Sequence, residues 1–284
     1  MAVARTSNSR NGLVARTPWW ARAAGVLLLS YTGLLGLMMW FEEQMLFVPA
    51  RYPRGDWKPK FQFEDATFTA ADGTKLHGWF LNHEQPGKAI LFAHGNAGNV
   101  AMWGHDGAEL RELGDAAVLV FDYRGYGRSE GSPTAKGVLA DARAARAWLA
   151  KRTGVAEQDV ILAGRSLGTG VAVDLAARDG AKALILISPF TSLPDVAALR
   201  YPFVPTHWLM RSRLDSLSLI KDFAGPMLML HGDNDQLIPL ALGQRLFAAA
   251  QEPKRLVVLR GSGHNDPING DGLAAMRDFL KTLP

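Results

Sequence analysis

Short apolar runs alternate with helical stretches from residue 63 onward, and this alternation limits the possible folds more than any other feature. The runs are of a length typical of buried strands, and they lie at 89–93, 117–121, 160–163, 183–187, 227–230 and 256–259. Helices are expected between and after them at 100–113, 134–152, 167–178, 240–251 and 268–282. Two further strands, 63–70 and 76–81, are expected to form a hairpin. The pattern predicts an α/β fold, with a mostly parallel central sheet and helices on both faces.

Polar residues that could carry chemistry follow several of these runs. His94, Ser166, Asp235 and His264 each lie just past a predicted strand. In open α/β sheets, sites form outside the carboxyl ends of the strands, so we expect these residues near one edge.

A G-x-S-x-G motif occurs twice, and its context separates the copies. The copy with Ser166 follows an apolar run and precedes an Ala-rich helical stretch, which predicts strand, sharp turn and helix. The copy with Ser129 lies in a Gly- and Arg-rich segment, so we interpret Ser129 as a loop residue.

Ser166, Asp235 and His264 together predict nucleophilic catalysis. A serine hydroxyl needs a base to take its proton and an acid to orient that base. Ser166 is the expected nucleophile, His264 the base and Asp235 the acid, with Asp233 as the nearest competitor for the acid.

The motifs HGNAGN (94–99), DYRGYGRSEG (122–131), GRSLG (164–168), HGDNDQLIP (231–239) and GSGHND (261–266) resemble those of the α/β-hydrolase superfamily. The order Ser, acid, His along the chain is also that of its members. The resemblance covers residues 60–284 and extends to membrane-anchored members with a short cap. It implies a serine hydrolase that needs no cofactor. It also implies an oxyanion hole made by the backbone N–H groups of Asn96 and Leu167.

Other polar residues are interpreted as structural. His94 and His231 each precede a Gly and are expected to bond to the local backbone. Asp122, Arg124 and Arg128 are expected to form an ion network that braces a loop, with a role in substrate binding as the alternative. The chain has no Cys, and its seven His lack metal-binding spacing, so a metal enzyme is not predicted.

Residues 23–41 form an uncharged apolar stretch that would span about 28 Å as a helix, close to a bilayer core. We interpret it as a transmembrane signal anchor; a cleavable signal peptide and a buried helix are the alternatives. Four arginines precede it and account for the whole net charge of +4, so the rest of the chain is neutral and no nucleic-acid surface is expected. The positive-inside rule places the N-terminus in the cytoplasm and the catalytic domain on the periplasmic or extracytoplasmic side.

The predicted organisation is therefore a basic tail (1–22), the anchor (23–41), an irregular connector (42–62) and a catalytic domain (63–284). The expected function is a serine hydrolase acting on esters or thioesters, with lipid or acylated substrates favoured. Residues 188–225 form a short apolar segment that either holds an acyl chain or packs on the sheet. A peptidase on the same fold and a non-catalytic membrane-associated binding protein are the alternatives. No oligomeric state is predicted.

Overall fold

The computed structural model describes residues 18–84, 87–266, 268 and 270–283, and the chain divides into two compact units between Phe41 and Glu42. The described part of the first unit is dominated by one helix, α1 (Trp19–Trp40). Within the described residues, α1 is the one helix long and apolar enough to cross a membrane, a property that signal sequences share. Most of the predicted basic tail, residues 1–17, lies outside the described residues.

The second unit contains the remaining elements. Its strands are β1 (Val48–Pro49), β2 (Glu64–Thr69), β3 (Lys75–Leu81), β4 (Lys88–Ala93), β5 (Ala97–Gly98), β6 (Ala116–Phe121), β7 (Ile161–Arg165), β8 (Leu184–Ile187), β9 (Met227–Gly232) and β10 (Lys254–Leu259). Its α-helices are α2 (Glu42–Leu46), α3 (Val100–Gly114), α4 (Ala135–Thr153), α5 (Leu167–Asp179), α6 (Leu193–Arg200), α7 (Thr206–Leu209), α8 (Ser216–Leu219), α9 (Leu240–Ala249) and α10 (Gly270–Thr282). Two short 3-10 helices lie at Glu157–Asp159 and Ile220–Asp222.

Eight of the described strands form one sheet in the order β10-β9-β8-β7-β4-β6-β3-β2. The six strands from β10 to β6 are parallel, and β3 and β2 add an antiparallel hairpin at one edge. The predicted α/β fold with a mostly parallel sheet is confirmed. The predicted hairpin is also present, with Thr69 paired to Lys75.

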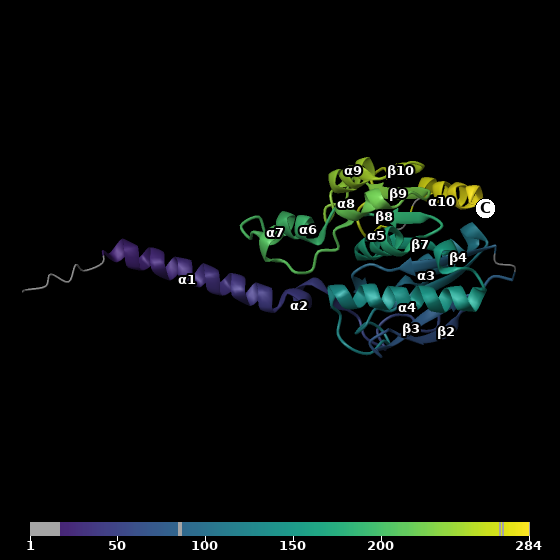
Figure 1. The fold of residues 1–284 in the computed structure, drawn as a ribbon, viewed down its shortest axis with the longest axis horizontal. Coiled ribbons are helices and arrows are strands. Elements are labelled where there is room, and N and C mark those ends of the chain that lie inside the picture. Colours follow the sequence, from purple (N-terminus) through teal and green to yellow (C-terminus); the bar gives the residue numbers. More distant parts are fainter. Residues whose placement is uncertain (1–17, 85–86, 267, 269, 284) are drawn as a thin grey trace, which may run out of the picture. The chain divides into compact units, whose positions relative to one another are not determined.

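Both faces of the sheet are covered by helices, because successive side chains of each strand point to opposite faces. In β4, Leu91 packs in one core with residues of α4, α5 and α9. Its neighbours Ile90 and Phe92 pack in a second core with residues of α3 and α10. Beyond the sheet, α6 and α7 lie side by side at one end of the unit, at the top left of the sheet in Figure 1.

The prediction of an irregular connector at residues 42–62 is wrong for its first part. Strand β1 pairs in parallel with β5, and the Ala50 N–H donates to the Gly98 carbonyl at 3.1 Å. The connector is therefore bound to the loop that follows β4. A two-residue strand has no side-chain periodicity, and the Pro and Arg content of this segment masked its regular pairing.

Candidate active site

The turn between β7 and α5 holds Ser166 in a backbone conformation that non-glycine residues rarely adopt. Its φ is 51° and its ψ is −119°. A Cβ on Gly164 would lie 2.3 Å from the Gly168 carbonyl oxygen, and one on Gly168 would lie 1.8 Å from the Ala93 carbonyl oxygen. Both positions therefore require glycine, which explains the motif. The tight turn places the partly exposed Ser166 at the carboxyl end of β7.

His264 connects Ser166 to Asp235. Its Nε2 lies 2.9 Å from the Ser166 hydroxyl oxygen, and its Nδ1 lies 2.7 Å from the Asp235 Oδ2. The tautomer with the proton on Nδ1 donates to Asp235 and accepts from Ser166. The structure thus brings the three predicted residues together, although 98 residues separate Ser166 from His264.

The Asp235 carboxylate is buried and held as the charged form. Burial raises its pKa, but hydrogen bonds from His264 and from the backbone N–H groups of Ile238 and Leu237 outweigh burial, and the net pKa is lowered. The two amides donate to Oδ1 at 2.8 and 2.9 Å. Asp233, the competitor in the sequence, instead accepts from the Gly261 N–H at 2.7 Å and braces the loop that precedes His264.

The two predicted oxyanion donors lie on loops that approach each other. Leu167 is the first residue of α5, where backbone N–H groups have no acceptor within the helix. A Cβ on Gly95 would lie 3.8 Å from the Arg165 carbonyl oxygen, so the Asn96 loop borders the Ser166 turn. Among the described residues, neither the Leu167 N–H nor the Asn96 N–H has a hydrogen-bond acceptor. Their role as oxyanion donors stays a prediction.

The Asn96 side chain ties its loop to the segment after α1. Its Nδ2 donates to the Leu46 carbonyl at 2.6 Å, and its Oδ1 accepts from the Val48 N–H at 3.2 Å and the Tyr126 hydroxyl at 3.0 Å. Asn99 adds bonds from its Nδ2 to the carbonyls of Ala50 and Arg54. Segment 46–54 therefore holds the loop that carries one predicted oxyanion donor.

Arg165 supports the loop that bears His264, a role that the sequence interpretation missed. Its guanidinium donates to the carbonyls of His264 and Asp266, at 3.2 and 2.8 Å, and pairs with Asp106 at 3.2 Å. It also lies over the Trp103 ring, 5.4 Å from the centroid. Arg165 occupies the variable position before Ser166 in the motif, so the pattern alone gave no signal for it.

The remaining two strand-end histidines bond to the backbone, as predicted. The His94 Nδ1 lies 2.7 Å from the Gly95 carbonyl oxygen, and the His231 Nε2 lies 2.8 Å from that of Ile238. Burial lowers the pKa of both rings, so both are neutral at pH 7.

Ser129 is a loop residue, as predicted, and both functions of its hydroxyl are occupied. The hydroxyl donates to the Asp122 carbonyl at 2.8 Å and accepts from the His77 N–H at 2.9 Å.

The predicted ion network of Asp122, Arg124 and Arg128 is only partly correct. Asp122 and Arg128 are linked through two other residues: the His77 ring lies 3.4 Å from the Asp122 carboxylate and 2.7 Å from the Asp65 carboxylate, which pairs with Arg128 at 3.3 Å. Arg124 lies outside this network. Asp122 accepts from the Val100 N–H at 2.8 Å. Arg124 pairs with Asp141 and Asp72, both at 2.7 Å. The order of these charged residues along the chain does not indicate which carboxylate each arginine pairs with in the folded protein.

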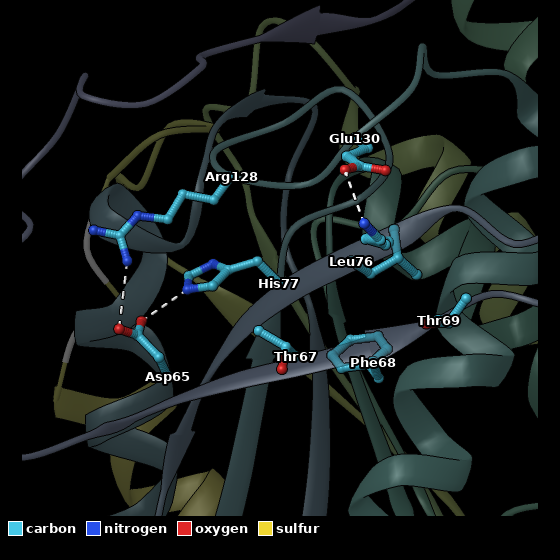
Figure 2. Close-up of a pocket in the computed structure, with 9 residues that line it drawn as sticks. Asp65, Thr67, Phe68, Thr69, Leu76, His77, Arg128 and Glu130 are labelled. Carbon is cyan, nitrogen blue, oxygen red and sulfur yellow. Dashed lines mark hydrogen bonds and ion pairs between the residues drawn. The ribbon is translucent and has the colours of Figure 1, made fainter.

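Arg128 lines a groove of about 500 Å³ on the β2–β3 hairpin. Figure 2 shows the Asp65 carboxylate between Arg128 and His77, at 3.3 and 2.7 Å. The Arg128 guanidinium also lies over the rings of Tyr52 and Trp57, with its carbon 4.7 and 4.6 Å from their centroids. Arg128 thus braces residues of segment 42–62 against the hairpin.

Over the described ranges, no group of three or more His, Asp or Glu side chains is placed to hold a metal ion.

Comparisons with known proteins agree on the family. The model of the alpha/beta hydrolase family matches residues 90–225. An uncharacterized protein of Mycobacterium tuberculosis is 43% identical over 221 residues, which cover 76% of this chain and 78% of the relative. Human alpha/beta hydrolase domain-containing protein 17B is 33% identical over 235 residues, which cover 80% of each chain. An esterase of Pyrococcus furiosus has a similar fold, with a TM-score of 0.68 at 20% identity over 84% of this chain and 98% of the esterase. This chain belongs to the alpha/beta hydrolase family.

Proposed function

We propose that this protein is a serine hydrolase that cleaves carboxylic esters or thioesters through an acyl-enzyme on Ser166. One observation carries the proposal: the His264 ring lies within hydrogen-bond distance of both the Ser166 hydroxyl and the Asp235 carboxylate. Membership of the alpha/beta hydrolase family and the likeness of the fold to an esterase support it.

In the acylation step, the Ser166 oxygen attacks the carbonyl carbon of the substrate. His264 takes the hydroxyl proton on Nε2, and the ionised Asp235 stabilises the resulting imidazolium through Nδ1. The tetrahedral oxyanion accepts from the Leu167 N–H, at the positive end of the α5 dipole, and from the Asn96 N–H. His264 then returns the proton to the leaving alcohol or thiol. A water molecule, activated by the same imidazole, releases the acyl group.

The buried carboxylate makes this base effective at neutral pH. The pKa of Asp235 is lowered, so the residue stays ionised and orients the His264 ring rather than taking a proton itself. A donor aimed at the oxyanion contributes roughly 10²–10³ in rate.

The apolar helix α1 favours acylated or lipid substrates. Phe190 and Leu193, just beyond β8, are buried in the core, and Gly170 of α5 packs against Phe190, so these two side chains pack against the fold and the preference for such substrates rests on α1. We propose that α1 anchors the protein in a membrane, with the hydrolase unit on the periplasmic or extracytoplasmic side, as the arginines before it indicate.

A fluorophosphonate probe tests the proposal, because it reacts with an activated serine. We expect one adduct, on Ser166, and none in Ser166→Ala. The matched control is Ser129→Ala, which changes the serine of the other G-x-S-x-G copy and should keep the label. A probe-inert wild-type protein between pH 6 and 9 would favour the non-catalytic binding protein. Faster cleavage of aminoacyl amides than of acyl esters would favour the peptidase.

A further inference from the structure

The segment between β8 and β9 carries large apolar side chains on its outside. We define the cap patch as Leu199, Tyr201, Phe203 and Trp208, whose exposed fractions are 54, 42, 87 and 88%. Other apolar residues of the same segment, such as Phe190 and Leu193, are buried. Single exposed apolar residues are normal on soluble proteins, but four large apolar side chains exposed within ten residues of one segment are more than single scattered residues, and we take them as a candidate interaction site.

The cap patch is held on an ordered scaffold rather than on a loose loop. The Thr206 hydroxyl donates to the Pro194 carbonyl at 3.0 Å, which ties α7 to α6. The His207 ring lies 3.3 Å from the Asp195 carboxylate, and Arg213 donates to the His207 carbonyl at 2.8 Å. These polar contacts fix α7 so that Trp208 faces away from the core.

The same segment is bonded to the residue that follows the apolar helix. The Glu42 carboxylate is 7% exposed and accepts from the backbone N–H groups of Ser212, at 2.7 Å, and Arg211, at 3.1 Å. Glu42 is two residues beyond Trp40, the last residue of α1, so at most about 7 Å of chain separates them. If α1 spans a membrane, Glu42 lies at its surface, and the cap segment is bonded to it there. Figure 1 shows α6 and α7 at the same end of the hydrolase unit as α2.

Exposed arginines lie in the same segment as the cap patch. Arg200 and Arg213 are exposed, whereas the nearest carboxylates are engaged: Asp195 lies 3.3 Å from the His207 ring, Asp215 caps α8, and the buried Glu42 lies 3.6 Å from the Arg211 guanidinium. Aromatic side chains with neighbouring arginines are typical of surfaces that lie at the boundary of headgroups and acyl chains.

We propose that the cap patch inserts into the surface of the membrane that α1 spans, as a second and peripheral membrane contact of the hydrolase unit. The inference rests on the proposed anchor. It gives Trp208 the role of an interfacial anchor and places the α6–α7 segment against lipid, where an acylated substrate would leave the bilayer.

The full chain allows a direct test, because it contains no Cys and a single Cys can be introduced at will. Trp208→Cys reports on the patch. Leu29→Cys, on the exposed surface of α1, reports on the anchor, and Val258→Cys, an exposed apolar residue of β10, is the matched control. Each variant is labelled with an environment-sensitive fluorophore and reconstituted into vesicles of phosphatidylcholine and phosphatidylglycerol. Quenching by doxyl-labelled lipid and by aqueous iodide is then measured.

We expect lipid quenching at position 208 to exceed that at position 258 by at least about threefold, with iodide quenching reversed. Lipid quenching at 29 combined with iodide quenching at 208 equal to that at 258 would overturn the inference and leave the anchor intact. Shielding of 208 from both quenchers would mean that a second protein copy covers the patch, which also overturns it. Absence of lipid quenching at 29 would overturn the anchor and the inference together, without bearing on the Ser166 chemistry.

Discussion

Replacement of Arg165 by Met should reduce turnover strongly although the side chain does not take part in the proposed chemistry. The guanidinium donates to the carbonyls of His264 and Asp266, and these bonds fix the loop on which the imidazole is mounted. Loss of the two bonds lets the loop shift. A displacement of about 1 Å at a reacting group costs roughly 10²-fold in rate, which corresponds to about 2.7 kcal/mol in the barrier.

The stability cost of the same substitution can be bounded. A hydrogen bond with a charged partner contributes about 1.5–3 kcal/mol, so the two bonds together contribute about 3–6 kcal/mol. Asp106 would lose its partner, but burial already raises the pKa of this carboxyl, and protonation limits the cost of leaving it unpaired. We therefore expect a loss of about 3–6 kcal/mol, to be compared with the stability of about 5–15 kcal/mol of an ordinary domain.

The assay is steady-state hydrolysis of a short p-nitrophenyl ester, combined with urea unfolding. Arg165→Met should lower kcat about 10²-fold with KM nearly unchanged, because Arg165 acts on the base and not on the substrate. Arg165→Lys keeps the charge but reaches fewer acceptors, so a smaller loss is expected. Arg178→Met is the matched control. The Arg178 side chain is exposed and its partner Asp174 keeps the hydrogen bond from Arg143, so neither kcat nor stability should change appreciably. A folded Arg165→Met protein with kcat within about threefold of the wild type would refute the reasoning.

Three further predictions concern residues that surround and position the proposed catalytic groups. Gly168→Ala places a Cβ 1.8 Å from a carbonyl oxygen of β4, so fluorophosphonate labelling should fall at least about 10²-fold, whereas Gly270→Ala, in open space, should label normally. Burial lowers the pKa of His231, so below pH 6.5 the unfolded chain binds a proton that the folded chain does not, and stability falls as pH decreases. Urea unfolding at pH 7, 6 and 5 gives the slope of the free energy of unfolding against pH. His231→Gln should reduce this slope by up to about 1.4 kcal/mol per pH unit, and equal slopes for variant and wild type would contradict the lowered pKa of His231. Asn96→Ala removes the side-chain bonds to the segment after α1, so kcat for the ester should fall about tenfold or more. An unchanged kcat would mean that these bonds do not position the predicted oxyanion donor.

The fold could be predicted because its signal is local. Each strand is a short apolar run, and predicted and observed bounds differ by only a few residues, as for 160–163 and Ile161–Arg165. The proximity of Ser166, Asp235 and His264 could also be predicted, because the carboxyl ends of parallel strands share one edge of the sheet.

Contacts between distant segments away from the carboxyl ends of the strands could not be predicted. Arg165 and Asp266 are 101 residues apart, and nothing in either neighbourhood indicates the other. The pairing of Arg124 with Asp141 and Asp72 depends on which loop lies beside α4. Segment 42–62 was predicted as irregular because its contacts are backbone pairings with β5 and side-chain bonds to Asn96, which leave no periodic pattern in the sequence.

The central claim is that the Ser166 oxygen becomes covalently acylated during turnover. Rapid acid quenching of the enzyme with a p-nitrophenyl ester, followed by peptide mapping by mass spectrometry, tests it most directly. The account predicts an acyl group on the peptide that contains Ser166, formed at the rate of the first p-nitrophenol released and absent in Ser166→Ala. An acyl group on a different residue, or undiminished ester hydrolysis by Ser166→Ala, would contradict it.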